Sequence, residues 1–361
     1  MFCRYLTIVL SLPLGVLFSE SAYVANSSSN TVSVIDTLSN TVTATVTVGA
    51  SPFDVAIAPD GTKAYVANRV SNNVSIIDAL SNTVTATVTV GNGPWSLAIT
   101  PDGTRVYVTN FSNDNMSVID ALSNTVTATV TLGDGPAGLA ITPDGTMAYV
   151  ANFNDNNVSV VNILSNTVTT TVGVGTRPVG VAITPDGTRA YVTNRDSSNV
   201  SVVNILSNTV TATVAVGSFP REVAITPDGT KAYVTNNGTN NVSVIDISSN
   251  TVTATVTVGS APFGLATTPL LPPSAFSGEQ EKNDFVVVSE YFNELHWQGS
   301  LSSIAGYFLR RNGTLIATLD SDILSYEDHN RNPSKRDTYS LSAFNSAGSK
   351  SMSVTTVVGG N

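Results

Sequence analysis

The stretch that decides the fold is Ser96–Gly133, "SLAITPDGTRVYVTNFSNDNMSVIDALSNTVTATVTLG". It contains four runs of strand-forming residues: SLAIT, RVYVTN, NMSVID and NTVTATVTLG. Pro-Asp-Gly after the first run predicts a tight turn, because proline presets φ and Asp-Gly tolerates the positive φ that follows. The continuous apolar first run predicts an inner strand buried on both faces. The Thr/Val alternation of the last run predicts an outer strand with one face toward water.

This unit recurs along the chain with a period of 42 residues, marked by Tyr23, Tyr65, Tyr107, Tyr149, Tyr191 and Tyr233. A period of about 40–45 residues is typical of one four-stranded propeller blade, which must stack on neighbours to bury its faces. Six inner-strand runs and six sets of the other three strands predict an all-β fold with a six-bladed β-propeller. In that ring "FGLATT" (263–268) completes the first blade. A seven-bladed ring is the alternative, if residues 13–18 or others contribute a further blade.

The repeated motifs support a family resemblance. The "YVTN" tetrapeptide, "NNVSVID", "SNTVTATVTVG" and "ITPDGT" resemble the YVTN family of β-propeller repeats, which occurs in surface-layer and secreted proteins. The resemblance covers residues 21–270 and implies extracytoplasmic binding or structural roles more often than a defined chemistry.

After a Pro-rich linker, residues 274–361 change in style. Alternating apolar and polar residues between turn signals predict a small β-sandwich. With Trp297, Tyr307, Tyr326 and Tyr339 the segment resembles a fibronectin type III domain. In that resemblance Tyr339 takes the tyrosine-corner role, with its hydroxyl bonded to upstream backbone.

The N-terminal segment 1–20 has one positive charge, Arg4, and then an apolar run that ends in small residues. This pattern predicts a signal peptide, although "PLGVL" (13–17) also resembles a decayed inner strand. The run is too short for a membrane span, so we expect no transmembrane segment. The net charge of −10, without a basic stripe, argues against nucleic acid as a partner.

Catalytic chemistry has little support in the propeller sequence. Both histidines, His296 and His329, and the single cysteine, Cys3, lie outside residues 21–270. A His-based triad or a His-ligated metal is therefore excluded there, and we expect no metal, no cofactor and no catalytic residues. The repeated aspartates of the Pro-Asp-Gly turns are expected to lie on separate blades with local turn roles.

The candidate site comes from the positions where the copies differ. Two segments vary: the one before each inner strand and the one between the second and third strands. Because the four strands of a blade alternate in direction, both segments emerge on the same face. Loops on a rigid scaffold gather binding residues, and aromatic residues and arginine are favoured interface anchors. The predicted binding residues are Phe53, Asp54, Trp95, Phe111, Phe153, Arg177, Phe219, Arg221, Glu222 and Phe263.

These observations favour a non-enzymatic binding or structural protein that is secreted or held at the cell surface. Its expected partner is a protein or polysaccharide bound through the loop face. One alternative is a propeller enzyme such as a lactonase or a quinoprotein-like dehydrogenase, and another is a surface-layer building block. For Phe53, Trp95 and Phe263, packing between blades competes with binding.

Overall fold

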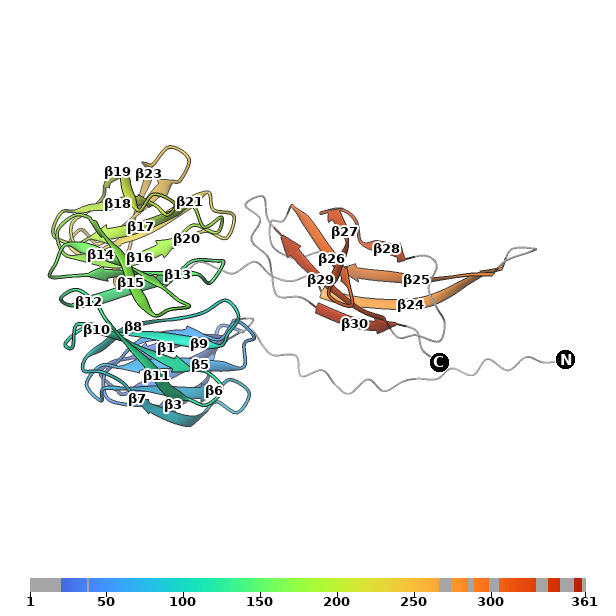
Figure 1. The fold of residues 1–361 in the computed structure, drawn as a ribbon, viewed down its shortest axis with the longest axis horizontal. Coiled ribbons are helices and arrows are strands. Elements are labelled where there is room, and N and C mark those ends of the chain that lie inside the picture. The colour runs from blue at the N-terminus through green and yellow to red at the C-terminus, as the bar shows by residue number, and fades with distance from the viewer. Residues whose placement is uncertain are drawn as a thin grey trace.

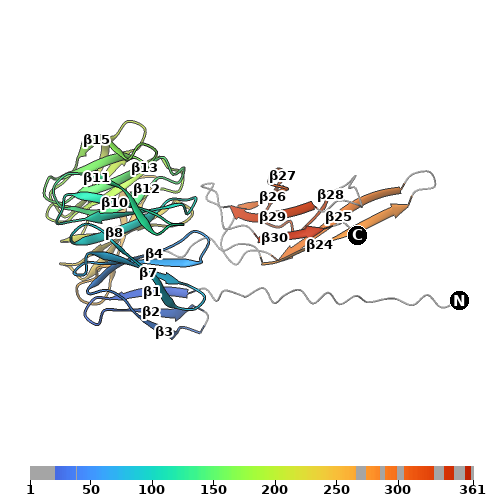
Figure 2. The same ribbon diagram turned by 60° about the horizontal axis from the view of Figure 1, so that its bottom comes forward.

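The computed structural model describes residues 21–37, 39–265, 274–284, 289–298, 305–328, 337–344 and 354–358. Regular structure in these residues is β-strand throughout, arranged as a propeller and a separate group of C-terminal strands (Figures 1 and 2). The predicted signal peptide, residues 1–20, lies outside the described residues. Within the described part of the chain, no helix is long and apolar enough to span a membrane.

The propeller strands follow the predicted order in every repeat. The first sheet has three strands, β1 (Ser21–Asn26), β2 (Thr31–Asp36) and β3 (Thr41–Thr47). The other five have four strands each, ordered from inner to outer, and their bounds are β4 (Pro52–Ile57), β5 (Lys63–Asn68), β6 (Asn73–Asp78), β7 (Thr83–Thr89); β8 (Pro94–Ile99), β9 (Arg105–Asn110), β10 (Asn115–Asp120), β11 (Thr125–Thr131); β12 (Pro136–Ile141), β13 (Met147–Asn152), β14 (Asn157–Asn162), β15 (Thr167–Gly173); β16 (Pro178–Ile183), β17 (Arg189–Asn194), β18 (Asn199–Asn204), β19 (Thr209–Ala215); and β20 (Pro220–Ile225), β21 (Lys231–Asn236), β22 (Asn241–Asp246), β23 (Thr251–Thr257).

Each sheet is one blade, and the blades are numbered here in chain order from the sheet of β1. Inner strands of successive blades pack side by side from β4 through β8, β12 and β16 to β20. These observations confirm an all-β propeller. The pairing of "FGLATT" with β1 involves residues 266–268, which lie outside the described residues.

The tyrosine of the repeated motif joins neighbouring blades. Tyr107 is fully buried, and its hydroxyl donates to the side-chain oxygen of Asn166 in the next blade at 2.9 Å. The same bond recurs one and two periods later, between Tyr149 and Asn208 and between Tyr191 and Asn250. A buried hydroxyl needs such a partner, so the tyrosine selects an oxygen acceptor in the adjacent blade.

Threonine and asparagine of the motif fix the inner edge of the blade. The Thr109 hydroxyl donates to the Ala137 carbonyl of the next inner strand at 2.7 Å. The buried Asn110 side chain donates to Asn115 and Ser117 on the following strand. The tyrosine and threonine of the YVTN motif therefore bond to the next blade, and its asparagine bonds within its own blade.

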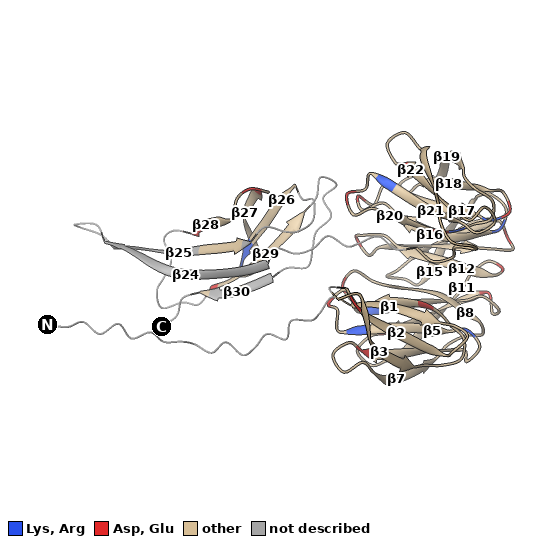
Figure 3. Ribbon diagram, turned by 180° about the vertical axis from the view of Figure 1, so that it is seen from behind, with Lys and Arg blue, Asp and Glu red and all other residues tan. Residues whose placement is uncertain are grey.

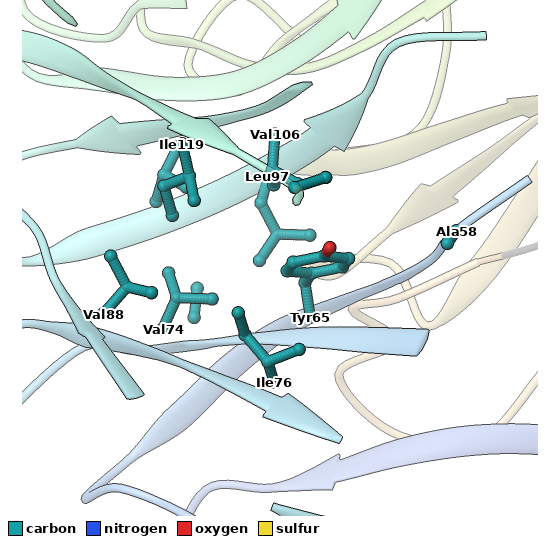
Figure 4. Close-up of a cluster of buried hydrophobic side chains, with 11 residues drawn as sticks. Ala58, Tyr65, Val74, Ile76, Val88, Leu97, Val106 and Ile119 are labelled. Atoms are coloured by element: carbon teal, nitrogen blue, oxygen red, sulfur yellow. The ribbon is translucent and has the colours of Figure 1, made fainter. Parts of the chain in front are cut away.

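The core lies between blades, where side chains of adjacent sheets interdigitate. Figure 4 shows one such cluster, with Tyr65, Val74 and Ile76 of one blade against Leu97 and Ile119 of the next. The second and third strands are the most buried, whereas the inner strands are mostly half-buried. The prediction of inner strands buried on both faces is therefore wrong. Inner strands contact the inner strands of both neighbouring blades, but they also surround the axial cavity described below, which leaves several of their side chains half-buried.

The C-terminal strands form two sheets, in the orders β24-β25-β28 and β27-β26-β29-β30. Trp297, Tyr307 and Tyr339 belong to one buried cluster, as expected for a sandwich core. The Tyr339 hydroxyl donates to the Asp328 carboxylate at 2.6 Å, where the sequence predicted a backbone acceptor. The strand bounds are β24 (Ser274–Asp284), β25 (Ser289–Gln298), β26 (Gly306–Arg311), β27 (Thr314–Asp320), β28 (Ser325–Asp328), β29 (Asp337–Phe344) and β30 (Val354–Val358).

Candidate functional site: the loop face of the propeller

The two variable segments of each blade meet through backbone hydrogen bonds. The amide of Arg69, just after the second strand, donates to the Ser51 carbonyl, just before the inner strand, at 2.9 Å. The Phe111 amide donates to the Gly93 carbonyl in the same way, and the Arg195 amide to the Arg177 carbonyl. The two variable connections therefore lie on the same face, as predicted. We call it the loop face; the Pro-Asp-Gly turns lie at the other end of the inner strands.

Five aromatic rings form a continuous row on the loop face. Ring centroids are 5.6 Å apart between Phe263 and Phe53 and 4.6 Å apart between Phe53 and Trp95. Trp95 stacks on Phe111 at 4.9 Å, and Phe111 lies 5.9 Å from Phe153. The row contains residues of inner strands, such as Trp95, and residues of loops, such as Phe111. Each ring packs against its neighbour in the row and is still partly accessible to solvent. It also brings the segment after the last blade beside the inner strand of the second blade.

Arginine side chains lie over these rings. The Arg69 guanidinium carbon is 4.7 Å from the Trp95 ring centroid, and that of Arg221 is 5.2 Å from the Phe263 centroid. Arg195 lies 5.3 Å from the centroid of Phe219, which stands outside the aromatic row. Cation–π contacts of this kind hold the guanidinium heads in place.

The sequence places Arg69 and Arg195 in the variable segments of this face, although the predicted binding residues do not include them. They occupy the same repeat position as Phe111 and Phe153, directly after the YV(A/T)N motif. Figure 3 shows Lys and Arg as short separate stretches among the strands of the propeller, so the arginines of the loop face do not belong to a basic stripe.

A cavity of about 80 Å³ opens at the centre of the loop face. Its lining comes from the inner strands of the second to sixth blades and from the segment after the last blade: Phe53, Asp54, Trp95, Ser96, Gly138, Val179, Arg221, Glu222, Phe263 and Gly264. Asp54 and Glu222 occupy the same repeat position as Ser96, Gly138, Gly180 and Gly264. The axis is therefore surrounded by two carboxyls, one hydroxyl and three glycines.

The two carboxyls of the axial cavity differ in hydrogen bonding. Asp54 accepts the Ser96 hydroxyl at 2.8 Å and the Leu97 amide at 3.0 Å, and these bonds oppose the rise in the pKa of Asp54 that burial causes. Burial and the charge of Asp54 raise the pKa of Glu222 to about 8, and within the described part of the chain Glu222 accepts a hydrogen bond from the Val223 amide alone. At neutral pH Glu222 is therefore held in the acid form, and its carboxyl can donate a hydrogen bond within the axial cavity.

Larger cavities lie on the opposite face, beside the Pro-Asp-Gly turns. One of them, about 640 Å³, is lined by Asp102, Asp144 and neighbouring turn residues. Asp102 accepts hydrogen bonds from Thr100 and Thr104, which hold the pKa of Asp102 below its usual value. Similar cavities recur between other blades, and the aspartates there have the predicted local turn role. Among the residues described, no three His, Cys, Asp or Glu gather closely enough to hold a metal ion.

Comparisons with known proteins support the fold. A family model described as "Lactonase, 7-bladed beta-propeller" matches residues 18–126 and 120–268, and its seven blades fit the seven-bladed alternative drawn from the sequence. No curated protein matches the chain. The structure is similar to that of Kuenenia stuttgartiensis hydrazine synthase, with a TM-score of 0.63 and 22% identity over 69% of this chain and 86% of that chain.

A second similar structure is that of a protein from Desulfotomaculum acetoxidans DSM 771 described as functionally unknown. It has a TM-score of 0.61 and 18% identity, and the match covers 87% of this chain and all of that one. Both structural likenesses establish the propeller fold alone. The resemblances to the YVTN repeats and to the fibronectin type III domain stay predictions.

Proposed function

The chain belongs to the family described as "Lactonase, 7-bladed beta-propeller", and the function that we propose for it has lactone hydrolysis as its alternative. We propose that it is a non-enzymatic binding protein, acting in secreted form or at the cell surface, that recognises a macromolecule through its loop face. The observation that supports this proposal is the continuous row of rings from Phe263 to Phe153 with arginines over it. Aromatic residues and arginine dominate the binding energy of protein surfaces.

The size of the axial cavity favours binding over turnover of a small substrate. Sites that enclose small molecules have volumes of about 300–1,000 Å³. The axial cavity, at about 80 Å³, has room for only a few water molecules. A ligand that covers the rim and inserts one group at the axis fits this geometry better than a substrate enclosed in it.

Lactone hydrolysis is the second candidate, because the family and the carboxyl pair both favour it. Asp54 would take a proton from the attacking water, and protonated Glu222 would donate one to the leaving alkoxide. We expect the full-length protein to leave a panel of lactones unhydrolysed at neutral pH. Hydrolysis that is lost in both D54N and E222Q would replace the binding proposal with this one.

The binding proposal is tested with the full chain on a combined protein and glycan array. Trp95→Ala with Phe111→Ala should abolish capture, because these two stacked, half-buried rings form the middle of the aromatic row. The matched control is Leu122→Ala with Leu206→Ala, which removes two apolar side chains that are 92% and 94% exposed elsewhere on the propeller. Capture that survives the first pair, or fails equally with the second, would contradict the proposal.

A further inference from the structure

Three arginines of the last blades gather where the two ends of the row of rings come round the axis. Arg177 and Arg195 lie over Phe153, and Arg221 lies over Phe263. Arg177 and Arg195 both approach Asp196, at 3.0 and 3.7 Å. Arg221 lies close enough to Arg195 for the second charge to lower the pKa of Arg221, in addition to the effect of burial. Three guanidinium groups thus share one carboxylate in a protein of net charge −10.

Two of these arginines have unused donors. The Nε–H groups of Arg195 and Arg221 are buried and have no hydrogen-bond partner among the described residues. Each guanidinium is held against an aromatic ring, Phe219 for Arg195 and Phe263 for Arg221. A buried donor without an acceptor is costly, so this arrangement favours the arrival of an oxygen acceptor. An oxyanion that accepts from two guanidinium groups also relieves their mutual repulsion.

The backbone before each inner-strand proline holds Arg177 in a conformation that its counterparts share. This residue has a positive φ in every blade: it is glycine in blades three and four, Gly93 and Gly135, and in the others it is Ser51, Arg177, Phe219 and Ala261, with φ of 52–55°. Side chains with a Cβ are strained in this region, whereas glycine is not. Replacing Arg177 by glycine therefore removes its guanidinium and relieves backbone strain at the same time.

We propose that Arg177, Arg195, Phe219 and Arg221 form an oxyanion-binding site and that the ligand of the loop face is an acidic polysaccharide. This inference rests on the proposed binding function. The carboxylate or sulfate groups of the polysaccharide bind the arginines, and its sugar rings stack on the aromatic row. A polymer of sugar rings offers repeated apolar faces at the spacing of neighbouring residues, which suits a row of rings 4.6–5.9 Å apart on a rigid scaffold.

The test is titration calorimetry of the full chain with four probes. Polygalacturonate carries carboxylates, chondroitin sulfate carries both carboxylates and sulfates, dextran is neutral, and poly-glutamate is an acidic peptide. We expect one or both acidic polysaccharides to bind, with affinity falling as salt rises, and dextran to bind at least tenfold more weakly. The difference between the first two probes identifies the preferred oxyanion. Binding of poly-glutamate alone, or equal binding of dextran, would overturn the proposal.

Variants separate the oxyanion site from general electrostatics. R195Q and R221Q should each weaken binding by about tenfold, the effect of losing a charged hydrogen bond. Lys231→Gln, which removes an exposed charge on the opposite face, should leave the affinity unchanged. R177G should weaken binding without lowering the melting temperature, because glycine removes the backbone strain. Equal losses in K231Q and R195Q would refute the site.

The outcomes also distinguish this inference from the proposed function. If W95A/F111A abolishes capture of a ligand that R195Q and R221Q bind normally, the loop face is a binding surface without an oxyanion site. If W95A/F111A has no effect on any ligand, the proposed function itself fails.

Discussion

Glu222→Gln tests the electrostatics of the axial cavity directly. The folded-state pKa of Glu222 is about 8, against an ordinary value of 4.5. Below pH 4.5 the side chain is protonated in both folded and unfolded states, so its contribution to stability is fully present. Between pH 4.5 and 8 the unfolded chain ionises while the folded protein keeps the proton, and stability falls as pH rises. Above pH 8 the folded protein must carry the charge.

The size of the effect follows from linkage. Each unit of pKa difference corresponds to about 1.4 kcal/mol, so a shift of about 3.5 units sets an upper limit of about 5 kcal/mol. Because water reaches the mouth of the cavity and relaxes around the charge, we expect a loss of about 2–5 kcal/mol between pH 5 and pH 9. For a propeller of this size, each kcal/mol corresponds to about 2–4 °C in melting temperature.

Thermal unfolding of the wild-type protein and E222Q from pH 4 to 9 measures how the melting temperature of each depends on pH. The wild-type melting temperature should fall more steeply toward alkaline pH, because glutamine has no proton to lose. Asp120→Asn is the control with the opposite sign. Hydrogen bonds from Ser123 lower the pKa of Asp120, so its contribution is present above pH 3.8 and is lost only toward acid pH. Parallel curves for wild type and E222Q from pH 5 to 9 would show that Glu222 is not held in the acid form.

Two further predictions concern the scaffold around the site. Tyr107→Phe should cost about 1 kcal/mol of unfolding free energy by chemical denaturation, because its hydroxyl donates to Asn166. Tyr23→Phe should cost nothing, because that buried hydroxyl has no partner among the described residues. Equal losses would contradict the role of the inter-blade bond. Gly180→Ala should lower the free energy of unfolding by about 1–3 kcal/mol, because a Cβ there would lie 2.5 Å from the backbone oxygen of the next inner strand. Gly264→Ala is the control at the same repeat position. A Cβ at Gly264 meets nothing within 4 Å, so this substitution should be nearly neutral.

The fold was predictable because near-identical copies act as controls on one another. Residues that recur in every copy, such as the tyrosine at 107 and 149, turned out to bond between blades. The common face of the variable segments followed from strand direction alone, and hydrogen bonds such as the one from Phe111 to Gly93 confirm it. Periodicity thus determined the scaffold and the side of it on which the candidate residues gather.

The contacts within the candidate site were not predictable from the same pattern. Asp54 and Glu222 are four periods apart, and only the curvature of the ring brings one charge close enough to raise the pKa of the other. The pairing of Arg69 with Trp95 depends on side-chain direction across a blade boundary, which a repeat alignment does not contain. The positive φ at Arg177 did have a signal, since glycine occupies that position in sister blades.

The uniform blades and the non-uniform rim have separate physical origins. Every blade needs the same inter-blade bonds and buried valines, so selection for stability keeps the strands alike and leaves the loop residues free to differ. Those residues did not diverge at random: rings from Phe53 to Phe153 occupy one sector, and guanidinium groups from Arg177 to Arg221 occupy the next. Packing contributes to the arrangement of the rings, because they contact one another. It does not account for three cations around one carboxylate, two of them with buried N–H groups that have no partner among the described residues, and this imbalance is the reason for assigning the loop face a ligand with an anionic group.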